Sequence, residues 1–376
     1  MDKGKVLMIL SNPFIVDPRV YKEAKSLSEE GYEVTVIVWD RHREYGEEDI
    51  IEGIRVVRVH NRGIMKILPH DLFREVFWWK SAYRKAIELY KSGYKFDVVH
   101  CHDLDTLPVG VWLKKKLGIK LIYDAHEIFG YMIARDMPKI VVNAAFWLEK
   151  TLIRHVDHII TVTEFNKKYF EKLCDRPVTI VMNCKDLVTK EYIPPKNDVF
   201  TIIYIGVLHK NRMFPEIVDI IGNIKGVKFV IAGKKENLYE EVKERCKKYD
   251  NVEFLGTIPF NEVVPKTLEA DAVICMINPS DLNNRIGLAN KQFEAMVCGR
   301  PIITTRGTYS AKMTEKLKCG IVVDYNGDSL KKGIEKLRDN PKLCEELGRN
   351  ALKAALEQYN WENEKRKLLK VYESLD

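Results

Sequence analysis

Short runs of apolar residues alternate with amphipathic stretches along the whole chain. The first half contains the runs KVLMIL, EVTVIVW, DVVHCH, KLIYDAH and HIITVT, and stretches between them, such as DPRVYKEAKSLSEEG, repeat apolar residues at helical spacing. A second series follows, with FTIIYIG, KFVIAG, VEFLG, DAVICMI, PIITT and GIVV, and with helices expected from about residues 215 and 237. Such alternation is typical of βαβ units. We therefore expect two α/β domains, each a doubly wound, Rossmann-like parallel sheet.

A loop rich in Pro, Lys and Asp separates the two series. This loop, residues 185–198, contains the pair Pro194 and Pro195 and is the best candidate for a domain boundary. We expect domains over residues 1–190 and 191–359, with a final helix, residues 360–376, packing back onto the first domain. Ligands of open α/β sheets bind at the carboxyl ends of the strands. With two such domains, the central cleft between them is the expected site.

Composition indicates a soluble globular protein. The chain has 376 residues, enough for two domains, of which 46% are hydrophobic and 31% charged. The net charge of +7 is spread along the chain, whereas a nucleic-acid binder would concentrate it. The eight cysteines have no C-x-x-C pair, which favours reduced core thiols in a cytoplasmic protein. The start, MDKGKVLMILSNPF, is interpreted as a first strand and not as a signal peptide, and no apolar run approaches a membrane span.

The turn after the first apolar run lacks a phosphate-binding fingerprint. It contains no glycine, and the chain has no G-x-x-x-x-G-K-[ST] motif, which weakens a kinase or dehydrogenase assignment. Asp17 can cap the following helix, and Pro18 suits its first turn. Arg19 comes next. It could reach an anion in the cleft, or it could be a solvated residue at a helix start.

Histidines gather at two strand ends. VVHCHDLDTLP contains His100 and His102, and LIYDAHE contains His126. An imidazole at the carboxyl edge of a sheet can bond a substrate hydroxyl or oppose developing charge. The alternative is a zinc site built from the three histidines, but no further clustered ligand is evident in the sequence. Asp103 and Asp105 could equally be turn or helix-cap residues.

The second series carries basic residues after its first strand and a carboxylate near a later one. YIGVLHKNRMF places Lys210 and Arg212 after the glycine turn at Gly206, where a phosphate could lie; a charged surface loop is the alternative. In NRIGLANKQFEAMVCGRPIITT, Glu294 lies in an expected helix a few residues before an apolar strand. An uncompensated charge there would be expensive, so Glu294 needs a reason.

These pieces together carry a family resemblance. DPRVYKEAKSLSEEGYEVTVI, CHDLDTLP, YDAHE, IGVLHKNRMF, NKQFEAMVCGRPIITT and GIVV, in this order and spacing, resemble the family-four retaining glycosyltransferases of GT-B fold. The resemblance covers essentially the whole chain. It implies an enzyme that moves a sugar from a nucleotide diphosphate sugar, of UDP or GDP type, to a hydroxyl acceptor that is a glycan or lipid-linked. It also implies that the first domain binds the acceptor and the second the donor.

The resemblance implies a role for each matching residue. Glu294 would accept hydrogen bonds from the donor ribose, Arg212 would bind the diphosphate, and His126 would contact the reacting sugar and help to stabilise the cationic transition state. The expected catalytic residues are His126 and Glu294; the expected donor-binding residues are Gly206, Lys210, Arg212, Asn290, Lys291 and Glu294; Arg19, His102 and Asp103 are expected near the acceptor or a phosphate. No metal and no cofactor are expected, because fixed cations and helix N-termini can stabilise the leaving group.

Three departures from the family pattern concern the donor side and the first loop. Ile286 occupies the place of the first glutamate of the Glu-x7-Glu motif, Val207 that of a common arginine, and NPFIVDP that of a glycine-rich loop. Lys210, Arg212 or Lys291 would have to compensate. Two alternatives stay open, a nucleotide-sugar epimerase of the same architecture and a non-catalytic nucleotide-sugar-binding relative. A nucleic-acid binder is the remote third.

One segment combines aromatic with basic residues. IMKILPHDLFREVFWWKSAYRKAIELYKSGYK, residues 64–95, joins Phe73, Phe77, Trp78, Trp79 and Tyr83 with Lys66, Arg74, Lys80, Arg84 and Lys85. On a helix this mixture suits a membrane interface or a lipid-linked acceptor. The alternative is that the aromatic residues form core and the charges a wet face. We expect a cytoplasmic protein with peripheral contact at the cytoplasmic membrane face.

Overall fold

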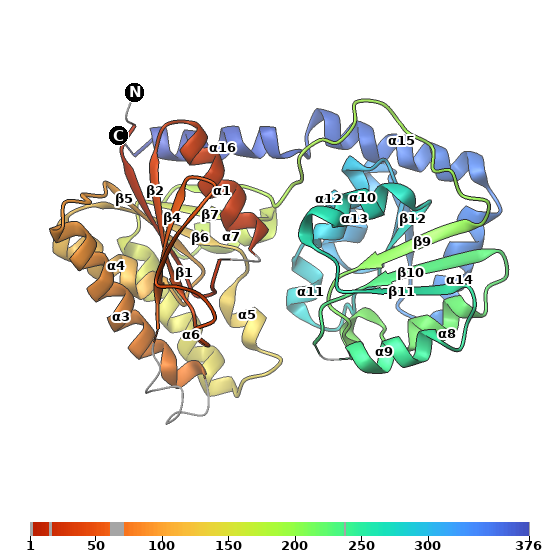
Figure 1. Ribbon diagram of the computed structural model, residues 1–376, viewed down its shortest axis with the longest axis horizontal. Helices are drawn as coiled ribbons and strands as arrows, with labels where there is room; N and C mark the ends of the chain where they lie inside the picture. The colour runs from red at the N-terminus through yellow and green to blue at the C-terminus, as the bar shows by residue number, and fades with distance from the viewer. Residues whose placement is uncertain (1–2, 15–16, 61–70, 237, 376) are drawn as a thin grey trace. The chain divides into compact units, whose positions relative to one another are not determined.

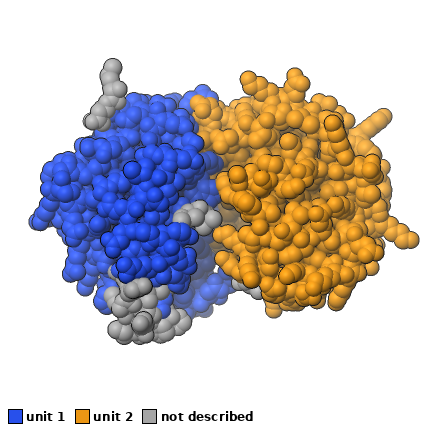
Figure 2. Space-filling model, viewed as in Figure 1, with its two compact units in different colours: residues 1–182, 365–376 blue, residues 183–364 orange. Residues whose placement is uncertain are grey.

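The chain divides into two compact units. The computed structural model describes all residues except 1–2, 15–16, 61–70, 237 and 376, and of residues 71–73 it describes only the backbone. Unit 1 comprises residues 1–182 and 365–376, and unit 2 comprises residues 183–364 (Figure 2). The expected boundaries, after residues 190 and 359, lie a few residues from these divisions.

Unit 1 is built on an eight-stranded sheet of order β3-β4-β2-β1-β5-β6-β7-β8 (Figure 1). All neighbouring strands pair in parallel except β3 and β4. The strands are β1 (Lys5–Leu10), β2 (Glu33–Trp39), β3 (Glu48–Ile51), β4 (Ile54–Val59), β5 (Val98–His102), β6 (Lys120–Ala125), β7 (His158–Thr161) and β8 (Val178–Ile180). The helices are α1 (Pro18–Glu29), α3 (Asp71–Lys91), α4 (Leu107–Leu117), α5 (Phe129–Ile133), α6 (Lys139–Leu152), η1 (Ile153–His155) and α7 (Glu164–Glu171).

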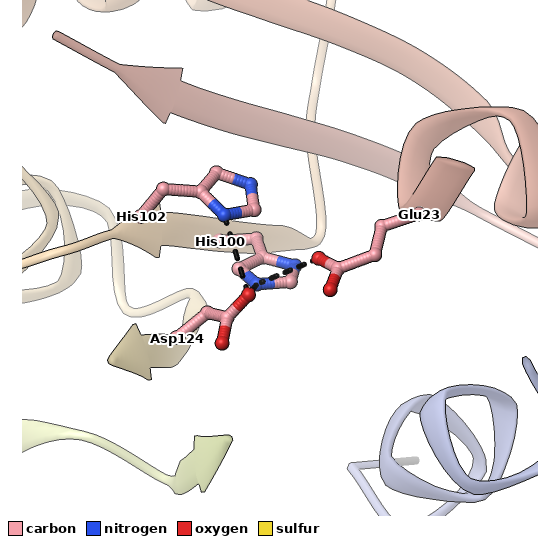
Figure 3. A group of neighbouring side chains, drawn as sticks. All are labelled: Glu23, His100, His102 and Asp124. Atoms are coloured by element: carbon pink, nitrogen blue, oxygen red, sulfur yellow. Dashed lines mark ion pairs between the residues drawn. The ribbon is translucent and has the colours of Figure 1, made fainter. Parts of the chain in front are cut away.

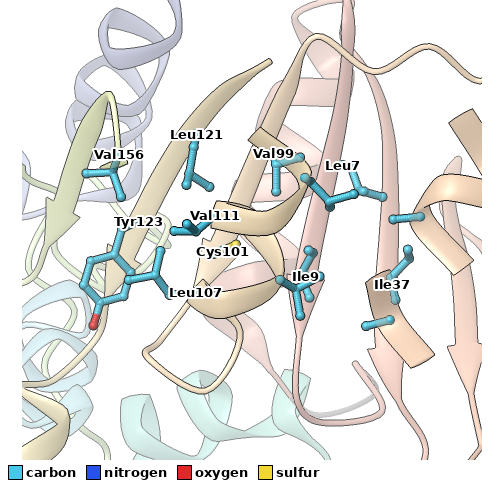
Figure 4. Close-up of a cluster of buried hydrophobic side chains, with 14 of the residues drawn as sticks. Leu7, Ile9, Ile37, Val99, Cys101, Leu107, Val111, Leu121, Tyr123 and Val156 are labelled. Carbon is cyan, nitrogen blue, oxygen red and sulfur yellow. The ribbon is translucent and has the colours of Figure 1, made fainter. Parts of the chain in front are cut away.

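The two faces of this sheet have different partners because strand residues alternate between faces. Val99 and Cys101 of β5 point into the apolar cluster that α4 covers with Leu107 (Figure 4). His100 and His102 therefore point to the opposite face. There His100 Nδ1 lies 2.8 Å from the hydroxyl of Tyr372 in α16 (Trp361–Glu373). Lys365 of α16 also pairs with Glu29 of α1 at 3.1 Å, so the end of the chain packs on unit 1.

Unit 2 contains a six-stranded parallel sheet of order β11-β10-β9-β12-β13-β14 (Figure 1). Its strands are β9 (Phe200–Ile205), β10 (Val227–Ala232), β11 (Val252–Gly256), β12 (Ala272–Cys275), β13 (Ile302–Thr305) and β14 (Gly320–Val323). Its helices are η2 (Lys210–Arg212), α8 (Glu216–Gly222), α9 (Tyr239–Cys246), η3 (Phe260–Glu262), α10 (Val263–Glu269), α11 (Leu282–Ile286), α12 (Asn290–Val297), α13 (Tyr309–Leu317), α14 (Gly327–Arg338) and α15 (Pro341–Glu357). The expectation of two Rossmann-like α/β sheets is confirmed.

Two further expectations concern the cysteines and membrane-spanning helices. All eight cysteines are free, and all but Cys174 are buried. Among the described residues, no helix is both long and apolar enough to cross a membrane.

Candidate active site

His126 lies directly after β6, at the carboxyl edge of the unit 1 sheet. Its Nδ1 is 3.2 Å from Asp103 Oδ2, and its Nε2 is 3.2 Å from Asp124 Oδ2. The backbone N–H of His126 also donates to Asp103 Oδ1 at 3.0 Å. Asp103 has a φ of 62°, in the left-handed region that Asp tolerates better than most residues. The imidazole is thus fixed between two carboxylates from the ends of β5 and β6.

The two carboxylates keep His126 positively charged. Burial lowers the pKa of His126, but the charges of Asp103 and Asp124 outweigh it and raise the pKa to about 10. Burial raises the pKa of Asp124, but Arg19 and His126 outweigh it and hold this pKa well below its usual value. At neutral pH the site therefore presents an imidazolium whose side chain is 19% exposed.

Arg19, in the first turn of α1, is buried and contacts Asp124. It is only 3% exposed, and its Nη2 and Nε bind the two oxygens of Asp124 at 2.8 and 3.1 Å. Its Nη1 donates to the carbonyl of Val181 at 2.8 Å, and Glu23, one helical turn later, lies 3.2 Å from its Nε. Neither sequence interpretation, an anion-binding residue or a solvated one, describes this arrangement. Arg19 holds Asp124, which in turn holds His126.

A group of four buried side chains next to Arg19 could offer ligand atoms to a metal ion. Glu23, His100, His102 and Asp124 place such atoms within 4.8 Å of one another (Figure 3). No ligand beside the histidines is evident in the sequence; the fold adds Glu23 from α1 and Asp124 from β6. Both carboxylates already contact Arg19, so an ion would have to compete with its guanidinium. We interpret the group as a charge network that supports His126.

Asp105 joins the same edge and was not among the expected site residues. The hydroxyl of Ser11, directly after β1, donates to Asp105 Oδ2, and Trp79 Nε1 donates to the Asp105 carbonyl at 2.6 Å. Asp105 Oδ1 is buried and has no hydrogen-bond partner within the described part of the chain. The loops after β1 and β5 and helix α3 therefore meet at a carboxylate with spare accepting capacity.

In unit 2, Gly206 directly follows β9 and leaves space for a lysine beside it. A Cβ at Gly206 would lie 2.6 Å from Lys291 Nζ. Any side chain at this position would therefore displace the lysine. The ammonium of Lys291 sits over the ring of Tyr204, 4.4 Å from its centroid. The glycine thus allows a cation from α12 to lie at the end of β9.

Arg212 brings a second cation to the same place. Its Nη1 donates to Asn284 Oδ1 at 3.2 Å. Burial raises the pKa of Tyr204, while Lys291 and Arg212 both oppose this rise, so both cations lie near its phenol. Lys210, in the same short helix, has an exposed side chain, and its carbonyl accepts a hydrogen bond from Tyr325 at 2.9 Å.

Glu294 is buried in the middle of α12, and its charge is balanced by Lys185, which is not among the expected site residues. Glu294 Oε1 lies 3.2 Å from Lys185 Nζ, and their side chains are 8% and 5% exposed. Lys185 Nζ also lies 4.7 Å from the centre of the Phe260 ring, and the Lys185 carbonyl accepts from Trp361 N at 3.0 Å. Lys185 stands at the start of the loop between the two series of strands, where no pattern marks it as a counterion.

The start of α12 completes the unit 2 edge. Asn290 is its first residue, and its side-chain oxygen accepts from Asn183 at 2.9 Å. Unpaired N–H groups and the helix dipole favour an anion at such a start. Ile286, at the end of α11, is 6% exposed, whereas Val207 is 43% exposed. Gly206, Arg212, Asn290, Lys291 and Glu294 therefore all belong to the carboxyl-edge loops and α12 of unit 2.

Two family models together match most of the chain. Residues 18–188 match the model of Glycosyltransferase Family 4, and residues 199–340 match that of Glycosyl transferases group 1. The chain belongs to the family 4 glycosyltransferases. This glycosyltransferase is 22% identical to one of the subunits of human phosphatidylinositol N-acetylglucosaminyltransferase, over 95% of its own length and 72% of the relative's. It is 24% identical to the putative glycosyltransferase EpsD of Bacillus subtilis, over 70% of its own length and 73% of the relative's.

Solved structures place the glycosyltransferase in the GT-B fold. Sucrose-phosphate synthase from Thermosynechococcus elongatus superposes with a TM-score of 0.77 at 15% identity, covering 99% of both chains. HepE of Anabaena, solved in complex with UDP-glucose, superposes with a TM-score of 0.73 at 12% identity, covering 99% of this chain and 100% of HepE. At these identities the likeness concerns the fold, and it confirms the expected GT-B class.

Proposed function

We propose that this enzyme transfers a sugar from a nucleotide diphosphate sugar to the hydroxyl of an acceptor, with retention of anomeric configuration. The donor is proposed to bind at the carboxyl edge of the unit 2 sheet. The observation that carries the proposal is the gathering of Lys291 and Arg212 around Tyr204 and the Gly206 turn. Two cations beside a helix start form the environment that a diphosphate requires.

The unit 2 residues are proposed to act mainly on the leaving group. As the bond between the sugar carbon and the phosphate oxygen breaks, negative charge grows on the diphosphate, and Lys291, Arg212 and the first turn of α12 stabilise it. The acceptor oxygen forms the new bond to the sugar, and its proton passes to the departing diphosphate. Glu294 accepts hydrogen bonds from the ribose hydroxyls while Lys185 keeps its carboxylate in place. In this proposal Lys291 and Arg212 provide the positive charge that a metal ion would otherwise supply to the diphosphate.

His126 is proposed to lie beside the reacting sugar. The side chains of His126 and Asp103 are 19% and 32% exposed, so a sugar hydroxyl can approach this pair. Arg19 and His102 are buried, at 3% and 1% exposure, and would act through Asp124 by holding the imidazolium in place. Asp103 would keep its contact with the His126 ring and, with its exposed part, also accept a hydrogen bond from the substrate.

The comparisons favour particular substrate classes. HepE was solved with UDP-glucose, which supports a UDP-type donor, with a GDP-type donor as the alternative. The name of the human relative specifies a phosphatidylinositol acceptor, which supports a lipid-linked acceptor over a free glycan.

Release of nucleotide diphosphate from UDP-glucose and from GDP-mannose tests the proposal. We expect His126→Asn and Glu294→Gln each to lower kcat/KM by roughly a hundredfold or more, the range typical of a lost catalytic contact. The matched controls His155→Asn and Glu269→Gln should leave it within about twofold of the wild type. Full activity in both site variants would refute the assignment. Recovery of an epimerised nucleotide sugar, with no sugar on any acceptor, would instead favour the epimerase alternative.

A further inference from the structure

Unit 1 contains an apolar groove between α3, α5, α6 and the loop after β5. We call it the α6 groove; it has a volume of about 310 Å³ and is lined chiefly by Trp79, Leu104, Phe129, Ile133, Val141 and Leu148. This volume is at the small end of the range for ligand pockets. A groove of this size suits a hydrocarbon chain better than a folded protein segment.

The outer rim of the α6 groove is an apolar stripe that faces solvent. Ile140 and Trp147 are 79% and 67% exposed, and Ala144 between them is also exposed and lines the groove. These positions, i, i+4 and i+7, share one face of a helix, and the exposed face of a helix in water is usually polar. Met132 and Met137, at 38% and 37% exposure, extend the apolar surface toward α5. Surfaces of this kind mark interaction sites.

The inner end of the α6 groove reaches the candidate active site. Asp105 lines the groove, and its Oδ1 has no hydrogen-bond partner among the residues that the structure describes. Two residues earlier in the same loop, Asp103 pairs with His126. Phe129, three residues after His126, forms part of the groove wall. An occupant of the groove would therefore bring one end next to His126, which is the position of a substrate and not of a regulatory partner.

Charges around the stripe complement an anionic lipid surface. Lys139 precedes Ile140, and Lys150 follows Trp147, both with exposed side chains. Between α5 and α6, Asp136 pairs with Arg135 at 3.0 Å, so this acid adds no net negative charge to the rim. Exposed Trp and Lys beside an apolar helix face are typical of helices that lie in a membrane interface.

We propose that the α6 groove receives the hydrocarbon chain of a lipid-linked acceptor, with the exposed stripe of α6 resting on an anionic bilayer and the acceptor hydroxyl at Asp105. This inference rests on the proposed function, because the acceptor must meet the donor sugar at His126. It gives the lipid-linked acceptor of the proposed function a binding place, with the hydrocarbon chain in the α6 groove. In this proposal the lipid surface contacts α6 and not primarily the aromatic helix α3.

Vesicle binding by matched variants of α6 tests the inference without any donor. The probe is co-sedimentation with vesicles of equal parts phosphatidylcholine and phosphatidylglycerol. Ala144→Glu places a carboxylate in the stripe, while Asn143→Glu adds the same charge at the neighbouring exposed residue, which does not line the groove. We expect Ala144→Glu to weaken binding about tenfold and Asn143→Glu by about twofold at most, because only the first charge must leave water. Ile140→Glu provides a second reading at the most exposed stripe position.

The outcomes separate this inference from the proposed function. Equal binding by Ala144→Glu and Asn143→Glu, or no binding of the wild type to the vesicles, would overturn the lipid groove. Self-association that is abolished by Ala144→Glu, without vesicle binding, would show a protein interface in its place and also overturn it. Donor hydrolysis by the wild type in the absence of lipid reports separately on the proposed function, since it requires His126 and the unit 2 residues but no occupant of the groove. Thermal unfolding of each variant confirms that it is folded.

Discussion

The ammonium of Lys185 and the carboxylate of Glu294 lie 3.2 Å apart with both side chains almost fully buried. A carboxylate in the middle of α12, close to an apolar strand, is thus compensated before any ligand arrives. Because removing one partner leaves the other charge buried and unpaired, Lys185→Met should lower the free energy of unfolding by about 3 kcal/mol. The double variant Lys185→Met/Glu294→Gln should recover part of this loss. Urea unfolding measures both, and a cost of under about 1 kcal/mol for the single variant would contradict the pairing.

Gly206 should control donor affinity through Lys291. A methyl group at Gly206 would lie 2.6 Å from Lys291 Nζ and must displace it. We expect Gly206→Ala to weaken UDP binding about tenfold, as measured by calorimetry, because one diphosphate cation leaves its position. In a Lys291→Ala background the same substitution should cost much less. Gly53→Ala, also at a positive φ but with no atom within 4 Å of the added Cβ, is the control. A Gly206→Ala effect that is undiminished in the Lys291→Ala background would count against this mechanism.

The charge on His126 should make stability depend on alkaline pH. The folded-state pKa is about 10, above the value of about 6.5 expected for an unfolded histidine. A raised pKa adds stability that is fully present below pH 6.5 and is lost as pH rises through about 10. The wild type should therefore lose more stability than His126→Asn between about pH 7 and pH 10. Urea midpoints for the two proteins across this range provide the measurement, and parallel curves would show that His126 is not charged at neutral pH.

Arg19 should tolerate no other cation. Its guanidinium binds both oxygens of Asp124 and the Val181 carbonyl, a planar arrangement that an ammonium cannot reproduce. Arg19→Lys is expected to destabilise the chain by about 2 kcal/mol and Arg19→Met by more, because Asp124 then loses a buried partner. The readout that distinguishes a positioning role is the His126 titration followed by NMR. Without the positive charge of Arg19, which lowers the pKa of His126, this pKa should rise in Arg19→Met.

The sequence predicts most of the fold and only part of the site, and the difference has a physical cause. Alternation of apolar runs with amphipathic stretches is local, so it locates strands such as β6 and β9 and the residues that follow them, His126 and Gly206. The partners of those residues come from far along the chain. Arg19 and Asp124 are 105 positions apart, and no local pattern joins them. Two signals were nevertheless present: Asp124 is a charge within an apolar strand, and Glu23 lies four residues after Arg19, the spacing of a helical ion pair.

The aromatic helix illustrates how a helical pattern leaves the choice of face open. In α3, Trp78 is fully buried and stacks on Trp39, whereas Phe77 is 40% exposed. Trp78 is therefore core, as the second interpretation of this segment expects, whereas the membrane-interface interpretation stays a prediction. Lys66 and the side chain of Phe73 lie outside the described residues. The exposed stripe on α6 cannot be predicted from the sequence, because KIVVNAAFWLEK is apolar on nearly all sides and periodicity alone does not say which side remains uncovered.

The return of α16 to unit 1 has a consequence for how the molecule can be divided. The chain passes between the units twice, near residues 182 and 364. Tyr372 reaches His100, and Leu368 and Val371 are buried. A single proteolytic nick in the loop of residues 185–198 would therefore give two fragments that stay bound to each other through the terminal helix. Unit 1 is accordingly a domain in space but not one continuous stretch of the polypeptide, and no single truncation can isolate it intact.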